Sequence, residues 1–243
     1  MSATLLVVPC YRERERLPQF LPDLCRALGD RTGLRIRAVD DGSGPEQQAW
    51  LAGYVEGLRR EFPLLEPAQL NAENVGKGGA VYSGWDLPDG ADCLAFVDAD
   101  GAVPAAEVSR LLTIASGLPD KAVFAVRTSE HGTTVARQFH RRLAGLAFRR
   151  LVRGLFHFPV QDTQCGFKLV PASAFAAIRP ALREMRFTFD VELTWHLLHR
   201  EVEIETVPVN WTERPGSHLR AASVWAMYRS LRALRRRLGD WRR

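Results

Sequence analysis

Residues 93–101 read Cys-Leu-Ala-Phe-Val-Asp-Ala-Asp-Gly, so that two carboxylates directly follow five apolar residues. A short apolar run of this kind is typical of a strand that is buried on both faces of a parallel sheet. Asp98 and Asp100 lie one residue apart at its end, where both can bind one divalent cation such as Mg²⁺ or Mn²⁺. The alternative is a solvated acidic turn that leads into a helix near Pro104, but the surrounding pattern favours the metal site.

Around this strand, apolar runs alternate with segments of helical apolar periodicity. Strands are expected at 5–8, 36–39, 93–97 and 122–126, and helices at 16–28, 47–62, 77–85 and 105–116. The second half is less regular, with helices expected at 134–155, 190–200 and 221–238 and strands at 167–170 and 203–209. The alternation indicates an α/β fold, a mainly parallel central sheet flanked by helices, and such sheets bind ligands at the carboxyl ends of their strands.

Composition bounds the function without naming it. The 243 residues carry a net charge of +5, with an isoelectric point near 9.3, which suggests an anionic partner such as nucleic acid, phospholipid or a phosphorylated substrate. The four cysteines are far apart and lack metal-ligand spacing, as expected of reduced thiols in a cytoplasmic protein. No apolar stretch reaches the roughly 18 residues that span a bilayer, and the short apolar run at the N-terminus does not resemble a signal peptide. We therefore expect a soluble or peripheral protein.

Three further polar segments adjoin expected elements. Asp40-Asp41-Gly42-Ser43 follows the strand at 36–39, where a carboxylate can accept from a base or ribose hydroxyl, or form an Asx turn and helix cap. The glycines of Asn74–Ala80 let backbone approach a ligand and Lys77 can meet a phosphate, although the spacing is not that of a Walker A loop and a flexible turn is the alternative. Asp162–Lys168 lines a sugar or acceptor pocket, or is only a loop.

Taken in order, these motifs resemble a known family. The ordered set is Pro9-Cys10-Tyr11-Arg12-Glu13, Asp-Asp-Gly-Ser, Gly-Lys-Gly-Gly-Ala, Asp-Ala-Asp-Gly, Asp-Thr-Gln-Cys-Gly-Phe-Lys, Phe189-Asp190-Val191-Glu192, Val207-Pro208-Val209-Asn210-Trp211 and Pro215-Gly216-Ser217. It is similar to the polyprenyl-phosphate sugar synthases of glycosyltransferase family two, and most similar to their dolichyl-phosphate β-glucosyltransferase branch. The resemblance extends from about Leu5 to Leu219, and it implies a Rossmann-like GT-A fold and an inverting transfer.

The resemblance also implies roles for individual residues. The nucleoside and donor would be held by Pro9, Tyr11, Glu13, Val39, Asp41 and the backbone of Ala99, and the metal and diphosphate by Asp98 and Asp100. The sugar and acceptor would be held by Gln164, Asp190 and Glu192, and phosphate groups by Arg127 and Arg137. From the residues themselves, Lys77 of the glycine-rich loop is a further candidate for the donor phosphates, and Arg141 of the basic helix for the acceptor phosphate. His218, beside the Pro-Gly-Ser turn, is a further candidate for the metal. Mannose-transferring relatives have a Gln where this chain has Ala102, which favours UDP-glucose over GDP-mannose as the donor.

The acceptor decides what the carboxylates must do. A phosphate monoester is largely dianionic at neutral pH because its second pKa is near 6, so it attacks the anomeric carbon without a general base. Asp190 and Glu192 would then orient hydroxyl or basic groups. With a sugar or wall-polymer hydroxyl as the acceptor, one of the two would have to act as the base. Both enzymatic alternatives stay open, whereas a nucleic-acid-binding protein is disfavoured because basic and aromatic residues do not interleave, and a metal-free scaffold because the Asp98–Asp100 pair is intact.

The last segment, 221–243, is expected to form a basic amphipathic helix beyond the main domain at 1–220. Its apolar residues follow helical spacing, at Met227, Leu231, Leu234, Leu238 and Trp241, and arginines flank them. Such a pattern is typical of a helix at a membrane interface, and packing of the stripe on the core is the alternative. A second arginine cluster, at 137–153, is either a solvated helix face or a mouth for the lipid phosphate. We therefore expect a cytoplasmic protein, peripheral at the inner face of the membrane.

Overall fold

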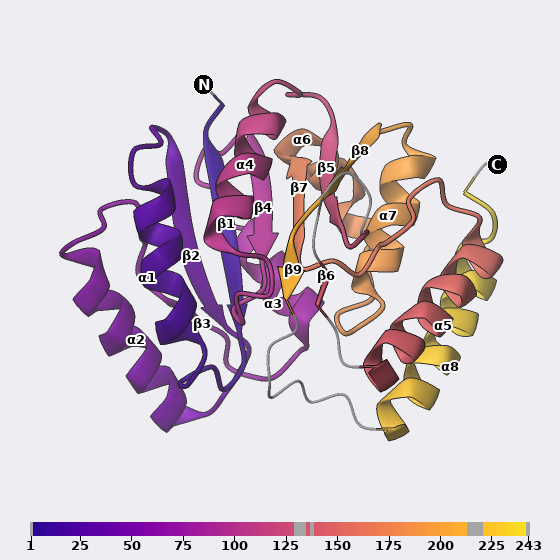
Figure 1. The fold of residues 1–243 in the computed structure, drawn as a ribbon, viewed down its shortest axis with the longest axis horizontal. Helices are drawn as coiled ribbons and strands as arrows, with labels where there is room; N and C mark the ends of the chain where they lie inside the picture. The colour runs from indigo at the N-terminus through magenta and orange to yellow at the C-terminus, as the bar shows by residue number, and fades with distance from the viewer. Residues whose placement is uncertain (1, 129–134, 137–138, 213–220, 242–243) are drawn as a thin grey trace.

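The computed structural model describes residues 2–128, 135–136, 139–212 and 221–241. Seven strands form one sheet in the order β3-β2-β1-β4-β7-β5-β8 (Figure 1). They are β1 (Thr4–Cys10), β2 (Leu34–Asp40), β3 (Gln69–Leu70), β4 (Cys93–Val97), β5 (Ala122–Val126), β7 (Phe167–Pro171) and β8 (Ile204–Pro208). β1 pairs parallel with β2 and β4, and β5 pairs parallel with β8, but β7 is antiparallel to both of its neighbours. A second, small sheet joins β6 (Val135–Ala136) to β9 (Trp211–Thr212).

Helices cover both faces of the sheet (Figure 1). On one face lie α1 (Leu17–Leu28), α2 (Pro45–Arg59) and α4 (Ala105–Ser116), whose apolar residues form one core with the facing side chains of β1, β2 and β4. On the other lie α3 (Lys77–Trp85), α6 (Ala172–Ile178), the short 3₁₀ helix η1 (Arg179–Ala181) and α7 (Phe189–His199). Burial on both faces is the reason why β4 and β5 are apolar throughout.

Two helices lie side by side at one end of the molecule, α5 (Phe139–Phe156) and α8 (Ala221–Leu238) (Figure 1). Leu231 and Leu234 of α8 are fully buried, in a cluster that includes Phe156 of α5 and Trp195 of α7. Part of the apolar stripe of the C-terminal helix therefore packs on the core. Among the helices within the described ranges, none is long and apolar enough to cross a bilayer.

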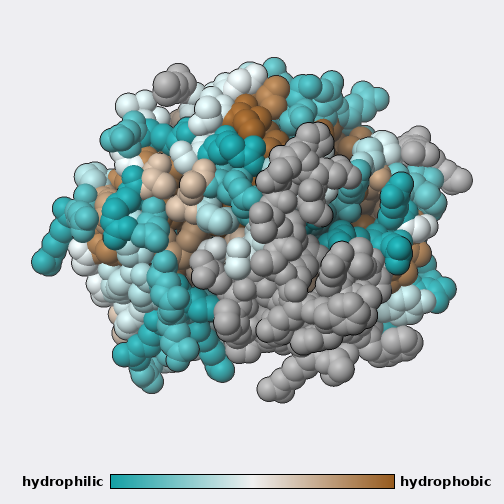
Figure 2. Space-filling view, in the orientation of Figure 1, coloured by the Kyte–Doolittle hydropathy of each residue, from teal (hydrophilic) through white to brown (hydrophobic). Residues whose placement is uncertain are grey.

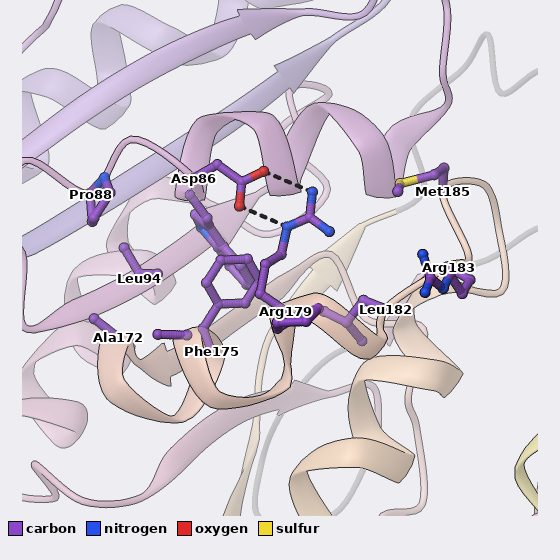
Figure 3. Close-up of a pocket in the computed structure, with 12 residues that line it drawn as sticks. Asp86, Pro88, Leu94, Ala172, Phe175, Arg179, Leu182, Arg183 and Met185 are labelled. Atoms are coloured by element: carbon purple, nitrogen blue, oxygen red, sulfur yellow. Dashed lines mark hydrogen bonds and ion pairs between the residues drawn. The ribbon is translucent and has the colours of Figure 1, made fainter.

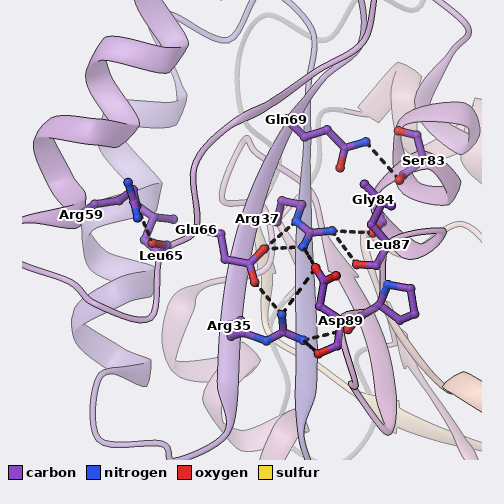
Figure 4. Close-up of polar contacts among 11 residues, drawn as sticks. Arg35, Arg37, Arg59, Leu65, Glu66, Gln69, Ser83, Gly84, Leu87 and Asp89 are labelled. Atoms are coloured by element: carbon purple, nitrogen blue, oxygen red, sulfur yellow. Dashed lines mark hydrogen bonds and ion pairs between the residues drawn. The ribbon is translucent and has the colours of Figure 1, made fainter.

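An arginine network fixes the C-terminal end of α3 (Figure 4). Arg37 of β2 is buried and donates to the carbonyls of Gly84 and Leu87, at 3.0 and 2.8 Å. Its charge is balanced by Glu66 and Asp89, each at 2.6 Å. Positive charge and donors at this end satisfy the free carbonyls of the helix. The network attaches one end of α3 to β2, while the other end begins at the glycine-rich loop.

Most expected elements are confirmed, and α3, β4, α4, β5 and α8 have the predicted bounds. The helix predicted from residue 134 is wrong at its start, since Val135 and Ala136 pair with β9 and the helix begins at Phe139. The short elements β3, β6, α6, η1 and β9 were not predicted. Among the coloured residues of the face seen in Figure 2, hydrophilic ones predominate and hydrophobic ones form small separate groups.

Candidate active site

Asp98 and Asp100 leave the sheet at its carboxyl edge, directly after β4. The N–H of Asp98 donates to the carbonyl of Gly166 at 2.9 Å. A side chain at position 166 would overlap the Asp98 carboxylate, so the close approach of these two segments requires glycine. Asp100 Oδ1 accepts the N–H of Ala102 at 2.9 Å. The turn after β4 and the loop before β7 thus hold the two carboxylates.

Lys77, the first residue of α3, reaches this acidic turn. Its Nζ lies 2.6 Å from Asp98 Oδ1, and the rings of Phe96 and Phe189 lie 5.0 and 5.7 Å away. Burial disfavours the charged form of Lys77, but the carboxylates of Asp98 and Asp190 outweigh it and raise the pKa of the lysine. The glycine-rich loop therefore brings a fixed positive charge to the predicted metal and diphosphate site.

Three carboxyl groups influence one another at this edge. Burial raises the pKa of Asp100, and the negative charge of Asp98 adds to the rise. Burial also raises the pKa of Glu13, although its ion pair with Arg16 opposes the change. Buried carboxylates that repel one another are stabilised when a cation or a proton binds to them. The cluster accordingly favours a bound cation.

The carboxylate oxygens at this edge fit a hard cation whose remaining ligands come from water and from a bound substrate. Among the described residues, no group of three or more acidic, cysteine or histidine side chains is arranged to hold a metal ion. Asp98 and Asp100 offer carboxylate oxygens from one turn. Mg²⁺ is commonly held by one or two carboxylates, with water and substrate phosphate oxygens completing its shell. The pair fits that arrangement, and His218 lies outside the described residues.

Asp190, in the first turn of α7, is buried beside a second lysine. Lys168 Nζ lies 2.6 Å from Asp190 Oδ1, and it also donates to the carbonyl of Cys165 at 3.1 Å. Gln164 Nε2 is 3.5 Å from Asp190 Oδ2. Burial raises the pKa of Asp190, while the ammonium groups of Lys168 and Lys77 oppose that rise. The structure thus brings Asp190 and Gln164 together with the Lys77–Asp98 pair.

Asp41 holds the glycine-rich loop in place. Its carboxylate accepts the N–H groups of Val75 and Gly76, both at 2.9 Å, and the side-chain amide of Asn74 at 3.0 Å. Burial raises the pKa of Asp41, although the hydrogen bonds from the Val75 and Gly76 N–H groups oppose the rise. In this structure the carboxylate predicted to contact the nucleoside is directed to the loop that carries Lys77.

The other side of this loop rests on the segment before α7. The N–H of Gly79 donates to the carbonyl of Met185 at 3.0 Å, at the end of α3 opposite Asp86 (Figure 3). A side chain at Gly78 would overlap Phe189, which explains why the loop is rich in glycine. Asp41 on one side and Met185 and Phe189 on the other therefore set the position of Lys77.

Glu192 lies two residues beyond Asp190 on α7, but the structure does not bring its carboxylate to the same place. The side chain is 0% exposed. Oε2 accepts the N–H groups of Arg183 and Glu184, at 2.8 and 2.6 Å, and Oε1 lies 2.8 Å from Nη1 of Arg237 in α8. Glu192 thus connects α8 to the segment that supports the glycine-rich loop.

Arg127, predicted to contact the acceptor phosphate, is engaged by the protein. Its guanidinium forms two hydrogen bonds with Asp162, at 2.7 and 2.9 Å, and stacks on Trp211 at 5.4 Å. The arginine holds the pKa of the Asp162 carboxyl far below its usual range, despite burial that acts in the opposite direction. Asp162 also accepts the N–H of Gln164 at 3.0 Å. The pair orders the loop on which Gln164 lies.

The remaining predicted residues are spread along the edge. Pro9 is half-buried at the end of β1 and Tyr11 is exposed beyond it, whereas Val39 and Ala99 are buried. Arg137 lies outside the described residues, and Arg141 belongs to the first turn of α5, where only the backbone is described.

Lys168, Asp162 and Phe189 complete the site, although the sequence predicted no individual role for any of them. Lys168 interrupts the apolar strand at 167–170, and a lysine at such a position signals a buried charge that needs a partner. Asp162 belongs to the quoted loop, but its pairing with Arg127 depends on two segments that meet only in the fold. Phe189 adds an aromatic side chain beside Lys77.

Solved structures of glycosyltransferases show that the fold of this chain is the GT-A fold. Glucosyl-3-phosphoglycerate synthase of Mycobacterium tuberculosis aligns with a TM-score of 0.70 at 16% identity, covering 98% of this chain and 81% of that one. A complex of that synthase with Mn²⁺, UDP and glucosyl-3-phosphoglycerate aligns with a TM-score of 0.65 at 17% identity, over the same shares of the two chains.

The chain belongs to glycosyl transferase family 2, whose profile matches residues 5–182. Among characterised relatives, dolichyl-phosphate beta-glucosyltransferase of Dictyostelium discoideum is 32% identical, over 88% of this chain and 68% of the relative. The enzyme of the same name in Mus musculus is 31% identical, over 98% and 76%. Polyprenol monophosphomannose synthase of Mycolicibacterium smegmatis is 28% identical, over 90% and 83%. The family predicted from the ordered motifs is therefore confirmed.

Proposed function

We propose that this protein transfers a hexose, with glucose favoured, from a nucleotide-sugar to a polyprenyl phosphate. The observation that carries the proposal is the Lys77–Asp98 pair beside Asp100 at the carboxyl end of β4. It combines carboxylates suited to a cation with a lysine suited to a phosphate. Relatives at about 30% identity are named for glucosyl transfer to dolichyl phosphate, which supports the acceptor class and the sugar.

On the donor side, Asp98 and Asp100 would hold Mg²⁺ or Mn²⁺, and a bound cation offsets the charge that develops on the departing diphosphate. Lys77 would exchange its contact with Asp98 for a phosphate oxygen. Pro9, Tyr11, Glu13, Val39 and the backbone of Ala99 would line the nucleoside, and Asp41 would act by holding the glycine-rich loop. UDP-glucose is the favoured donor and GDP-mannose the second choice.

On the acceptor side, a phosphate oxygen attacks the anomeric carbon from the face opposite the diphosphate. The new bond joins that carbon to the acceptor oxygen, and the bond to the diphosphate oxygen breaks with inversion. The dianionic acceptor needs no proton removed. Asp190, already paired with Lys168, would orient a sugar hydroxyl together with Gln164. Arg127, Arg137 and Arg141 would attract the acceptor phosphate, with Arg127 also ordering the loop of Gln164.

The site would lie at a membrane surface, because a polyprenyl chain partitions into the bilayer. We therefore place the protein at the cytoplasmic face of the membrane, as a peripheral protein.

A donor screen followed by a transfer assay tests the proposal. Thermal unfolding with Mn²⁺ and either UDP-glucose or GDP-mannose should show a rise in Tm for UDP-glucose that disappears when EDTA is added. Transfer of radiolabelled glucose to a short-chain polyprenyl phosphate, with release of UDP, should then follow. Asp98→Asn should abolish both results, and Asp23→Asn, on the exposed face of α1, should preserve them. Transfer to a sugar hydroxyl but not to the phosphate would contradict the acceptor.

A further inference from the structure

Exposed large apolar side chains are concentrated at the edge of the sheet that carries the site. Among the described residues, the side chains of this kind are Tyr11, Leu70, Val75, Leu87 and Phe187. Tyr11 directly follows β1, Leu70 ends β3, and Val75 belongs to the glycine-rich loop. Leu87 lies at the opposite edge, between α3 and the start of β4. Single exposed apolar residues are ordinary, so the informative feature is their shared location.

Val75 and Phe187 lie on two segments that are in contact. A side chain at Gly76 would come within 2.6 Å of the carbonyl of Met185 and 2.7 Å of Cγ of Arg186. Asn74 accepts from Arg186 at 3.5 Å. Val75 is 40% exposed and Phe187 is 49% exposed. We call Val75, Arg186 and Phe187 the rim, since they border the loop that positions Lys77.

The charge around the rim is positive. Arg183 and Arg186 are exposed, while Glu184 between them is engaged by Thr188 and Arg237. Glu73 is exposed on the adjacent loop and carries the opposite sign. Farther along, the exposed side of α8 adds arginines at Arg229, Arg232 and Arg236. An aromatic residue flanked by arginines is suited to the headgroup region of an anionic bilayer.

The C-terminal helix cannot supply the inserted residues in this packing. Leu231 and Leu234 of its apolar stripe are fully buried against α5 and α7. The outer side of α8 is arginine-rich and can add attraction at a distance, but its insertion would first require separation from the core. The exposed Phe187 and Val75 require no such change.

We propose that the rim docks this protein on an anionic lipid surface, with Phe187 and Val75 in the headgroup layer and Arg186 at the lipid phosphates. This inference rests on the proposed function, because a lipid-linked phosphate reaches the site from the bilayer. Docking through the rim turns the glycine-rich loop and the Lys77–Asp98 pair toward the surface that holds the acceptor.

Vesicle co-sedimentation tests the rim with matched controls. The vesicles are phosphatidylcholine with or without 30% phosphatidylglycerol, at low and high NaCl. Phe187→Ser should lower the partition coefficient by about tenfold and Arg186→Gln by about fivefold. Leu87→Ser, at 53% exposure on the opposite edge, and Arg60→Gln, exposed at the end of α2, should leave it unchanged. Binding should require the anionic lipid and weaken with salt.

Docking through the rim would be contradicted if Phe187→Ser and Leu87→Ser lost vesicle binding equally. It would also be contradicted if Phe187→Ser and Arg186→Gln bound as well as the wild type, or if the wild-type protein did not bind the vesicles. A parallel assay separates this outcome from a failure of the proposed function. With a short-chain, water-soluble polyprenyl phosphate, Phe187→Ser should transfer glucose at the wild-type rate. A wild-type protein that binds vesicles through the rim but never transfers to that acceptor would contradict the function and leave the docking surface established.

Discussion

Lys77 Nζ lies 2.6 Å from Asp98 Oδ1, so that the residue opening α3 provides a counter-charge for the acidic turn after β4. A divalent cation at Asp98 and Asp100 would compete with this ammonium group. A diphosphate bound beside the cation would in turn give Lys77 a new anionic partner. The position of Lys77, and with it the glycine-rich loop, therefore depends on whether a cation and a diphosphate are bound at the donor site.

Lys77→Met should separate these two effects. Without the ammonium group, Mn²⁺ no longer competes with a lysine, and its affinity should rise by about tenfold. Transfer should fall by about 100-fold, because a charge aimed at the leaving diphosphate is lost. Mn²⁺ titration followed by electron paramagnetic resonance and steady-state UDP release measure the two quantities. Lys121→Met removes a lysine paired with Glu203 at the far end of β5 and should change neither. A parallel fall in metal affinity would contradict the competition.

The raised pKa of Asp100 predicts how cation binding depends on pH. In the window between the ordinary carboxyl pKa of about 4 and the raised value in the fold, the folded protein holds more protons than the unfolded chain. Metal-free stability from this group therefore decreases as pH rises through that window. Cation binding requires the carboxylate and displaces the proton.

The Tm difference between samples with Mn²⁺ and with EDTA should accordingly widen as pH rises above the ordinary carboxyl pKa of about 4 and level off once Asp100 is ionised in the fold. Titrating groups that do not sense the cation cancel in that difference. Asp100→Asn should give a small difference at every pH. A wild-type difference that is constant over the range would show that Asp100 does not titrate in the site.

Gly166→Ala tests the approach of Asp98 to the loop before β7. The added methyl group would overlap the Asp98 carboxylate, so the carboxylate must move, at a cost of about 1–3 kcal/mol in the free energy of unfolding. Mn²⁺ affinity, measured by titration, should fall by at least tenfold. Gly57→Ala in α2 has no atom in the way, and it should gain up to about 1 kcal/mol because alanine favours helix. Unchanged metal affinity in Gly166→Ala would exclude Asp98 from the metal site.

The sequence alone predicts the carboxyl edge of the sheet well, since it depends on local patterns. The apolar run at 93–97 and the glycines before 77–85 locate β4 and α3 at their observed bounds. Two loops at the ends of such strands must meet at one edge, which explains why Asp98 and Lys77 are found together. The direction of β7 could not be predicted in this way, because a buried apolar strand has the same pattern in parallel and antiparallel pairs.

The motif also could not predict that Asp190 faces the site while Glu192 faces away from it. Residues two apart on a helix point about 200° from each other, so the two carboxylates could not both face one pocket. Which of them faces the site depends on their partners, Lys168 and Arg237, from distant segments. Pairings of this kind arise only when the tertiary structure forms.

The contact between Arg237 and Glu192 predicts that the C-terminal helix influences the donor site. Arg237→Met would leave the fully buried Glu192 without its cation, at a cost of about 2 kcal/mol, less than for a fully buried pair because Arg237 is 37% exposed. The N–H groups of Arg183 and Glu184 would keep their acceptor. The segment that leads to Met185 should then be held less firmly, and so should the loop that carries Lys77. The KM for the donor should therefore rise several-fold.

A double-mutant cycle checks this coupling. Because Glu192→Gln removes the same interaction, the double variant Glu192→Gln/Arg237→Met should lose less stability in urea unfolding than the sum of the single variants. Arg236→Met, exposed on the adjacent position of α8, should match the wild type in stability and in KM. Additive losses, or a KM that rises equally in Arg236→Met, would show that α8 packs on the domain without supporting the glycine-rich loop.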